Sequence, residues 1–248
     1  MSWLWSQPKS RNHYTAEDVN TWAAMVTRNV TIQHRLACVT DTPNGIDSSV
    51  EILPLPDFPD IDSSEWPESR GYPQSYRRLH MWHPEAAEWY GERFACFDLD
   101  CLVTGNLDAL LSRTEDVLIA RGTRQRAPYN GSFLMMTAGA RPQVWKNMTP
   151  ERLINASKLY IGSDQAFIRY MCGPDLPTIG EESGVYTYSG SRFPAPFKGK
   201  PNNRDLRANL RLLREPKYPE NMRLMFFTGT VKPRELVDVH PFIAKHYR

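Results

Sequence analysis

The sequence lacks the features that would place the protein in a membrane, in a disulfide-bonded secreted class or on a zinc scaffold. No apolar run approaches the roughly 20 residues that a membrane-spanning helix needs. The 4 cysteines among 248 residues form no CxxC pair and no zinc-type spacing, so we expect reduced thiols. The start, MSWLWSQPKSR, lacks the long apolar region of a signal peptide, which predicts a cytoplasmic protein.

The sequence also lacks a strong charge of one sign, internal repeats and low-complexity segments. Its 30 basic and 28 acidic residues give a net charge of +2, so no global field calls for a nucleic-acid partner. Apolar residues make up 41% and charged residues 23%, as in ordinary globular proteins. We expect one domain over residues 1–248, with a basic, proline-containing segment at about residues 190–220.

Alternating helix and strand signals predict an α/β fold. Thr15 and Asp18 form a capping-box pattern, and apolar residues then recur at helical spacing. An apolar strand at residues 35–39 follows and ends in Thr40 and Asp41. Further elements are expected at residues 76–90 (helix), 94–97, 117–120 and 132–137 (strands), 163–172 (helix) and 223–229 (strand).

The segment FACFDLDCLVTG, residues 94–105, places two carboxylates inside an apolar run that resembles a buried strand. Side chains two residues apart on a strand share one face, and two buried like charges are costly unless something neutralises them. Asp98 and Asp100 could be solvated loop residues. The apolar flanks instead favour a position at the carboxyl end of a strand, where α/β folds bind ligands, with a divalent cation between the carboxylates.

A haloacid-dehalogenase-like phosphatase is one functional interpretation of this segment. Its nucleophile motif is an apolar strand followed by D-x-D-G-T, which FDLDCLV resembles in part. Cys101 and Leu102 stand where that motif has glycine and threonine, and the segment lies in mid-chain. No later acidic motif follows a suitable lysine, so this interpretation is the weaker one.

Six short motifs occur in an order that resembles GT-A glycosyltransferases of the glycogenin and bacterial galactosyltransferase kind, including small phage and bacterial relatives. In chain order they are CVTDTPNGI, YRRL, FDLDCLVTGNLDALL, YNGSFLMM, SDQAFI and FFTGTVKP. The resemblance runs from about residue 15 to residue 240. It implies a Rossmann-like GT-A fold with a mixed, mostly parallel sheet flanked by helices, and a place in a bacterial or phage-infected cytosol.

The resemblance implies roles for individual residues in binding a nucleoside-diphosphate sugar, with a UDP-hexose as the expected donor. Arg78 of YRRL would lie near the diphosphate, and Asn130 would face the sugar. Asp164 and Gln165 would act as the catalytic pair, addressing sugar hydroxyls and the reacting face. The remaining contacts to the nucleotide sugar are expected from Thr40, Asp41, Asp98, Gly131, Gly229 and Lys232.

The resemblance also implies a Mn²⁺ or Mg²⁺ ion held by Asp98 and Asp100, which would stabilise the charge on the departing diphosphate. Relatives place a metal-binding histidine beside the late glycine, whereas residues 226–228 here are Phe-Phe-Thr. His240 is the nearest substitute in sequence. Alternatively, Lys232 and the arginine of YRRL carry the charge instead of a metal.

The acceptor is the least defined part of the prediction. A protein, a lipid-linked glycan, a small molecule and a modified DNA base are all open. The stretch KGKPNNRDLRANLRLLREPK, residues 198–217, spaces its arginines along one helical face, which predicts a solvated surface or a dock for an anionic partner. Trp66, in the proline-broken stretch at residues 51–76, is a candidate acceptor platform.

Transfer with retention of configuration is favoured because no catalytic base stands out, and inversion normally requires one. A catalytically weak module that binds a nucleotide sugar is the third interpretation, since the late histidine is missing.

Overall fold

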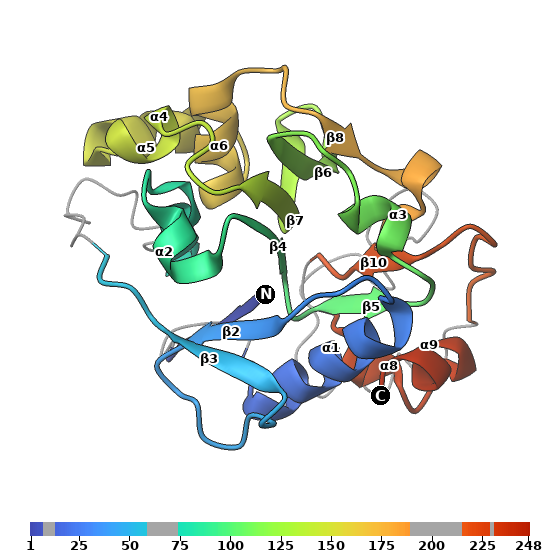
Figure 1. The fold of residues 1–248 in the computed structure, drawn as a ribbon. Helices are drawn as coiled ribbons and strands as arrows, with labels where there is room; N and C mark the ends of the chain where they lie inside the picture. Colours follow the sequence, from blue (N-terminus) through green and yellow to red (C-terminus); the bar gives the residue numbers. More distant parts are fainter. Residues whose placement is uncertain (7–12, 59–73, 189–214, 229–230) are drawn as a thin grey trace. The chain divides into compact units, whose positions relative to one another are not determined.

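The structure is a computed structural model that describes residues 1–6, 13–58, 74–188, 215–228 and 231–248 (Figure 1). The chain divides into two compact units. The first unit comprises Ser2–Ile52, Phe97–Arg113 and Gly180–Arg248, and the second comprises Met1, Leu53–Cys96 and Thr114–Ile179. No helix in the described ranges is both long and apolar enough to cross a lipid bilayer. The single domain expected from sequence stays a prediction.

The first unit contains two sheets in its described part. In one, the strand order is β1-β2-β3, with β1 parallel to β2; in the other it is β5-β10-β9, with β10 antiparallel to β5 and parallel to β9. The strands are β1 (Ser2–Leu4), β2 (Leu36–Thr40), β3 (Val50–Pro54), β5 (Cys101–Val103), β9 (Val185–Thr187) and β10 (Leu224–Phe226). The helices are α1 (Ala16–Asn29), α3 (Asp108–Leu111), η2 (Glu181–Ser183), α8 (Pro233–Leu236) and α9 (Pro241–His246).

Helix α1 begins where its capping pattern predicts. The Asp18 carboxylate accepts a hydrogen bond from the Thr15 backbone N–H at 2.8 Å, which satisfies a donor that the helix start would otherwise leave open. The predicted apolar face is buried, with Val19 and Trp22 fully enclosed, and the helix packs against β5 and β1. The helix predicted from residue 15 is confirmed.

The second unit is built on a mixed sheet with the strand order β4-β7-β6-β8. Its strands are β4 (Arg93–Phe97), whose last residue belongs to the first unit, β6 (Val117–Arg124), β7 (Ala127–Thr137) and β8 (Thr178–Ile179). Its helices are η1 (Gln74–Trp82), α2 (Ala86–Tyr90), α4 (Gln143–Lys146), α5 (Pro150–Leu159) and α6 (Asp164–Cys172). The helix expected at residues 76–90 is instead a 3-10 helix and a short α-helix, with Pro84 in the break.

Strands β6 and β7 pair antiparallel but lose register beside the predicted sugar-binding motif. Ile119 pairs with Leu134, whereas the next residue, Ala120, pairs with Asn130. Residues 131–133 are therefore extra on β7 and form a bulge. Bulges redirect side chains and are common next to active sites, so this irregularity gives Asn130 and Gly131 orientations that a regular strand would not.

An aromatic cluster beside η1 contains a buried histidine. The His80 ring stacks on His83 at 5.4 Å between centroids and meets Trp89 and Trp145 edge-on, while its Nδ1 lies 2.8 Å from the Tyr90 hydroxyl. Burial, with a smaller effect from His83, lowers the pKa of His80 from 6.5 to about 4. The neutral imidazole is therefore the form that suits the folded unit.

Stability is expected to fall below pH 6.5 because the unfolded state binds a proton at His80 before the folded state does. The loss should develop between pH 6.5 and about 4. After allowance for solvent screening, we expect the free energy of unfolding to fall by roughly 2 kcal/mol over this range. Urea unfolding at a series of pH values measures it. His80→Gln should flatten this part of the profile, while the exposed control His34→Gln should leave it unchanged; equal profiles for the two variants would contradict the assignment.

Candidate active site

The two aspartates of the D-x-D motif lie in the link between β4 and β5. Strand β4 ends at Phe97, residues 99 and 100 form a bend, and β5 begins at Cys101. The strand predicted at residues 94–97 is confirmed, and both carboxylates follow its carboxyl end. Asp98 is half-buried, and Asp100 is only 8% exposed.

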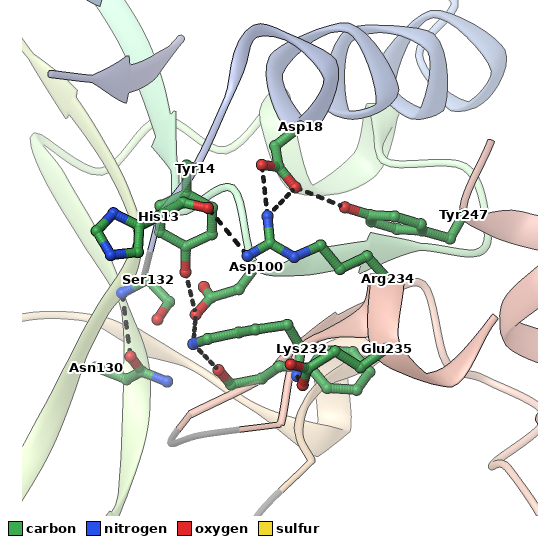
Figure 2. A network of polar contacts seen from close by, with 11 residues as sticks. His13, Tyr14, Asp18, Asp100, Asn130, Ser132, Lys232, Arg234, Glu235 and Tyr247 are labelled. Carbon is green, nitrogen blue, oxygen red and sulfur yellow. Dashed lines mark hydrogen bonds and ion pairs between the residues drawn. The ribbon is translucent and has the colours of Figure 1, made fainter. Parts of the chain in front are cut away.

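Strand β10 brings the late motif FFTGTVKP to Asp100. Phe226 pairs with Cys101, and the Phe227 backbone N–H donates to the Asp100 carbonyl at 2.9 Å. The Asp100 carboxylate oxygen Oδ2 accepts hydrogen bonds from Lys232 Nζ at 2.5 Å and from the Tyr14 hydroxyl at 2.9 Å (Figure 2). Two residues that the sequence nominated, Asp100 and Lys232, are thus in direct contact.

The dipeptide Lys232-Pro233 explains why the lysine is held in place. A residue before proline favours extended backbone, and Lys232 has φ −118° and ψ 155°. Pro233 then opens helix α8, and the Lys232 backbone N–H donates to the Glu235 carboxylate at 2.9 Å. The ammonium also donates to the Phe227 carbonyl at 3.3 Å, so both ends of the lysine are fixed.

A second polar cluster supports Tyr14 from α1 and the C-terminal helices. Arg234 donates to both oxygens of Asp18, at 3.0 and 2.7 Å, and its guanidinium lies 5.8 Å from the centre of the Tyr14 ring (Figure 2). The Tyr247 hydroxyl donates to the same carboxylate at 3.3 Å. Sequence analysis assigned no role to Tyr14 or Arg234, because their partners are distant in the chain and no local pattern marks them.

The cluster around Asp100 combines one ammonium, one phenol and a buried carboxylate. Burial raises the pKa of Asp100 above its ordinary value, although the Lys232 ammonium acts in the opposite direction. Burial, followed by the negative charge of Asp100, raises the pKa of Tyr14 far above its usual range. Tyr14 therefore remains a hydrogen-bond donor at any physiological pH.

The residues around Asp100 are a poor fit for a divalent cation. Such an ion needs several oxygen or imidazole ligands, and no group of three His, Cys, Asp or Glu side chains that could hold a metal occurs in the described residues. Phe226, which stands in the stretch where the resemblance leads one to expect the late histidine, is fully buried. His240 is buried beside the Tyr218 hydroxyl, 3.3 Å from its Nδ1, and is not brought to the two aspartates.

Thr40 and Asp41 lie at the carboxyl end of β2 in the first unit. Thr40 is buried, and its hydroxyl accepts from the Thr42 backbone N–H at 2.9 Å. Asp41 is exposed and accepts from the Ser6 backbone N–H at 2.9 Å. Gly229, Trp66 and most of the basic stretch at residues 198–217 lie outside the described residues, so their expected roles stay predictions.

The second unit gathers the other predicted residues at the bulge of β7. The guanidinium of Arg78, from η1, donates through Nη2 to the Gly131 carbonyl, and its Nε lies 3.5 Å from Asp164 Oδ2. The Gln165 amide oxygen accepts from the Gly131 backbone N–H at 2.9 Å. The Asn130 amide oxygen accepts from the Ser132 backbone N–H at 3.0 Å, which fixes the start of the bulge.

Burial strengthens the hydrogen bonds and the ion pair within this cluster. Arg78, Asn130 and Asp164 are 7%, 7% and 6% exposed, and hydrogen bonds to charged groups strengthen where water is excluded. Asp164 opens α6 directly after Ser163, as predicted, so its carboxylate faces the positive end of the helix. A hydrogen-bonded carboxylate, amide and guanidinium at one bulge can bind a polyhydroxylated ligand.

Comparison with known proteins shows which solved structures have a similar fold. No family model and no curated protein matches the chain. Among solved structures, the galactosyltransferase LgtC in complex with donor and acceptor sugar analogs matches 100% of this chain and 97% of its own, with a TM-score of 0.56 and 13% sequence identity. An active-site mutant of LgtC, with glutamate in place of a glutamine, matches 94% of this chain and 89% of its own, with a TM-score of 0.53 and 13% identity.

The glycosyltransferase GlyE of Streptococcus pneumoniae TIGR4 matches a smaller share, 67% of this chain and 43% of its own, with a TM-score of 0.43 and 12% identity. The likeness to LgtC extends over nearly the whole of both chains, so it concerns the complete fold. The protein therefore has the mixed α/β GT-A fold that the order of its motifs predicted.

Proposed function

We propose that the protein is a glycosyltransferase that moves a sugar from a nucleoside-diphosphate donor, with a UDP-hexose as the expected donor, to an acceptor hydroxyl. The observation that carries this proposal is the clustering of the motif residues within each unit. Asp100 and Lys232 meet in the first unit, and Arg78, Gly131, Asp164 and Gln165 meet in the second. The fold shared with LgtC agrees with it.

In the proposed reaction, the bond between the anomeric carbon and the diphosphate oxygen breaks, and both electrons remain on the diphosphate. The acceptor oxygen bonds to the anomeric carbon, and its proton is released to water. Cationic donors are needed where negative charge grows on the diphosphate, and a carboxylate is favourable where positive charge grows on the sugar. Lys232 offers the former and Asp164 the latter.

Asn130, Asp164 and Gln165 are proposed to hold the donor sugar. Gln165 is hydrogen-bonded through its amide oxygen to Gly131 and lies 3.3 Å from the Ile161 carbonyl through its nitrogen. Its role is therefore to fix the bulge or to exchange one of these bonds for a sugar hydroxyl. The active-site glutamine described for LgtC supports giving a glutamine such a place.

The surroundings of Asp100 do not favour the Mn²⁺ or Mg²⁺ ion predicted at Asp98 and Asp100. The reaction is therefore proposed without a role for that ion. We place the reaction in a cytosol, since Cys38, Cys96, Cys101 and Cys172 are free thiols. The acceptor would be a glycan, a protein or a modified DNA base. An anionic acceptor would suit the basic stretch at residues 198–217.

Release of nucleoside diphosphate tests the proposal. The purified protein is incubated with a panel of sugar nucleotides, with Mn²⁺ or with a chelator, and the products are separated by chromatography. We expect slow release from one donor, and loss of that release in Asp100→Ala but not in the exposed control Asp238→Ala. Absence of both release and nucleotide binding across the panel would contradict the proposal.

The same assay separates the alternative functions. A binding module would bind a donor without releasing its nucleotide. A phosphatase would hydrolyse p-nitrophenyl phosphate and form an aspartyl phosphate on Asp98, and no such product is expected.

A further inference from the structure

The charge partner of Asp100 is already part of the protein chain. The Lys232 side chain is 5% exposed and the Asp100 side chain 11%, and the ammonium lies 2.5 Å from carboxylate oxygen Oδ2. The Tyr14 hydroxyl donates to the same oxygen. A metal ion that used this oxygen would have to displace both donors and would lie against a fixed positive charge.

The stretch where the resemblance expects a histidine supplies none. Phe226 lies there within β10, paired with Cys101, and its side chain is fully buried. The Lys232 backbone N–H is bonded to Glu235, and the ammonium is bonded to the Phe227 carbonyl and to Asp100, so both the backbone and the end of the side chain are fixed. Burying an ammonium is costly unless it is paired, and Asp100 provides that partner here.

We propose that Lys232 performs at this D-x-D motif the electrostatic task of a divalent cation, so that nucleoside-diphosphate binding is independent of metal. This inference rests on the proposed function. Asp100 is the positioning residue that holds the ammonium, and Tyr14 acts through Asp100 by donating to its carboxylate. The ammonium has three N–H donors. Asp100 and the Phe227 carbonyl each accept one of them. During transfer the ammonium stays protonated and donates a hydrogen bond to the diphosphate, which keeps the electron pair of the broken bond.

Titration calorimetry with UDP on the full-length protein tests this inference without any turnover. The dissociation constant in the presence of chelator should match that in Mn²⁺ within about twofold, because the resident ammonium supplies the charge. Lys232→Met should weaken UDP binding by about 10- to 100-fold in chelator. The matched control Lys245→Met, at an exposed lysine of α9, should bind UDP as the wild type does.

The outcomes distinguish failure of metal-independent binding from failure of the proposed glycosyltransferase function. UDP binding that requires Mn²⁺ would overturn the inference and leave the transferase proposal standing. Wild-type affinity in Lys232→Met would overturn it as well. If no nucleoside diphosphate binds under either condition, the proposed function fails and the inference fails with it.

Electron paramagnetic resonance of Mn²⁺ gives a readout that does not depend on the nucleotide. The wild-type protein should leave the spectrum of the free ion unchanged. A bound signal that disappears in Asp100→Asn would overturn the inference.

Discussion

Arg78→Ala is expected to lower the free energy of unfolding by about 3–5 kcal/mol. The substitution removes the partner of Asp164 and leaves that carboxylate buried and only 6% exposed. It also removes the donor to the Gly131 carbonyl within the bulge of β7. Arg78 lies among Ile119, Leu134 and Ile168 and is only 7% exposed, so solvent cannot readily replace the lost guanidinium. Urea unfolding followed by tryptophan fluorescence measures the change.

The neighbouring residue provides a matched control for this prediction. Arg77 is half-buried and carries the same charge, so Arg77→Ala should cost less than about 1 kcal/mol. The double variant Arg78→Met/Asp164→Leu should recover most of the loss, because an apolar pair of similar volume leaves no uncompensated charge. Equal losses in the Arg77 and Arg78 variants would show that the ion pair contributes nothing specific to stability.

Local sequence signals predicted the helices that carry the site. Thr15 and Asp18 mark the start of α1 through nearest-neighbour hydrogen bonding, which the structure confirms. The helix predicted at residues 163–172 is confirmed as α6, which ends at Gly173 with positive φ, although the Ser163 side chain makes no capping hydrogen bond. Helix α5 (Pro150–Leu159) was missed although its signal was present. Thr149 caps it by accepting from the Arg152 backbone N–H, and proline occupies its first turn.

Strand pairing could not be predicted in the same way. The bulge of β7 depends on which residues of β6 lie opposite it, and the pairing of β10 with β5 joins segments more than one hundred residues apart. Periodicity reports which face of a strand is buried, not its partner or register. The short strands β1, β8 and β9 have too few residues to show any period.

The candidate site was predictable in part for the same reason. The order of the motifs predicted Arg78, Asp164 and Lys232 as site residues, because their charged side chains can bind a phosphate or a sugar. It did not reveal Tyr14, whose contact with Asp100 spans 86 residues and depends on where α1 packs. It also suggested a metal at Asp100 and did not reveal the contact between the Lys232 ammonium and this carboxylate, because that contact depends on how segments distant in the chain pack together.

Asp164→Asn is expected to slow sugar transfer, or release of the donor sugar to water, by about 10²- to 10³-fold. Asparagine keeps the shape of the side chain but removes the negative charge that would oppose the positive charge growing on the sugar in the transition state. UDP affinity should change less than about threefold, since the proposed nucleotide contacts at Thr40, Asp41 and Lys232 are untouched. Initial rates and UDP titration calorimetry on the same preparation measure both quantities.

Two controls make this result specific to the donor sugar. Asp175→Asn removes the same charge from an exposed site in the second unit and should leave the rate unchanged. Because Asp164→Asn also weakens the partnership with Arg78, its unfolding curve must show a folded protein at the assay temperature. A slow rate with unchanged UDP affinity and an intact fold would assign Asp164 to the sugar. If UDP affinity fell in parallel with the rate, Asp164 would act on the nucleotide instead of on the sugar.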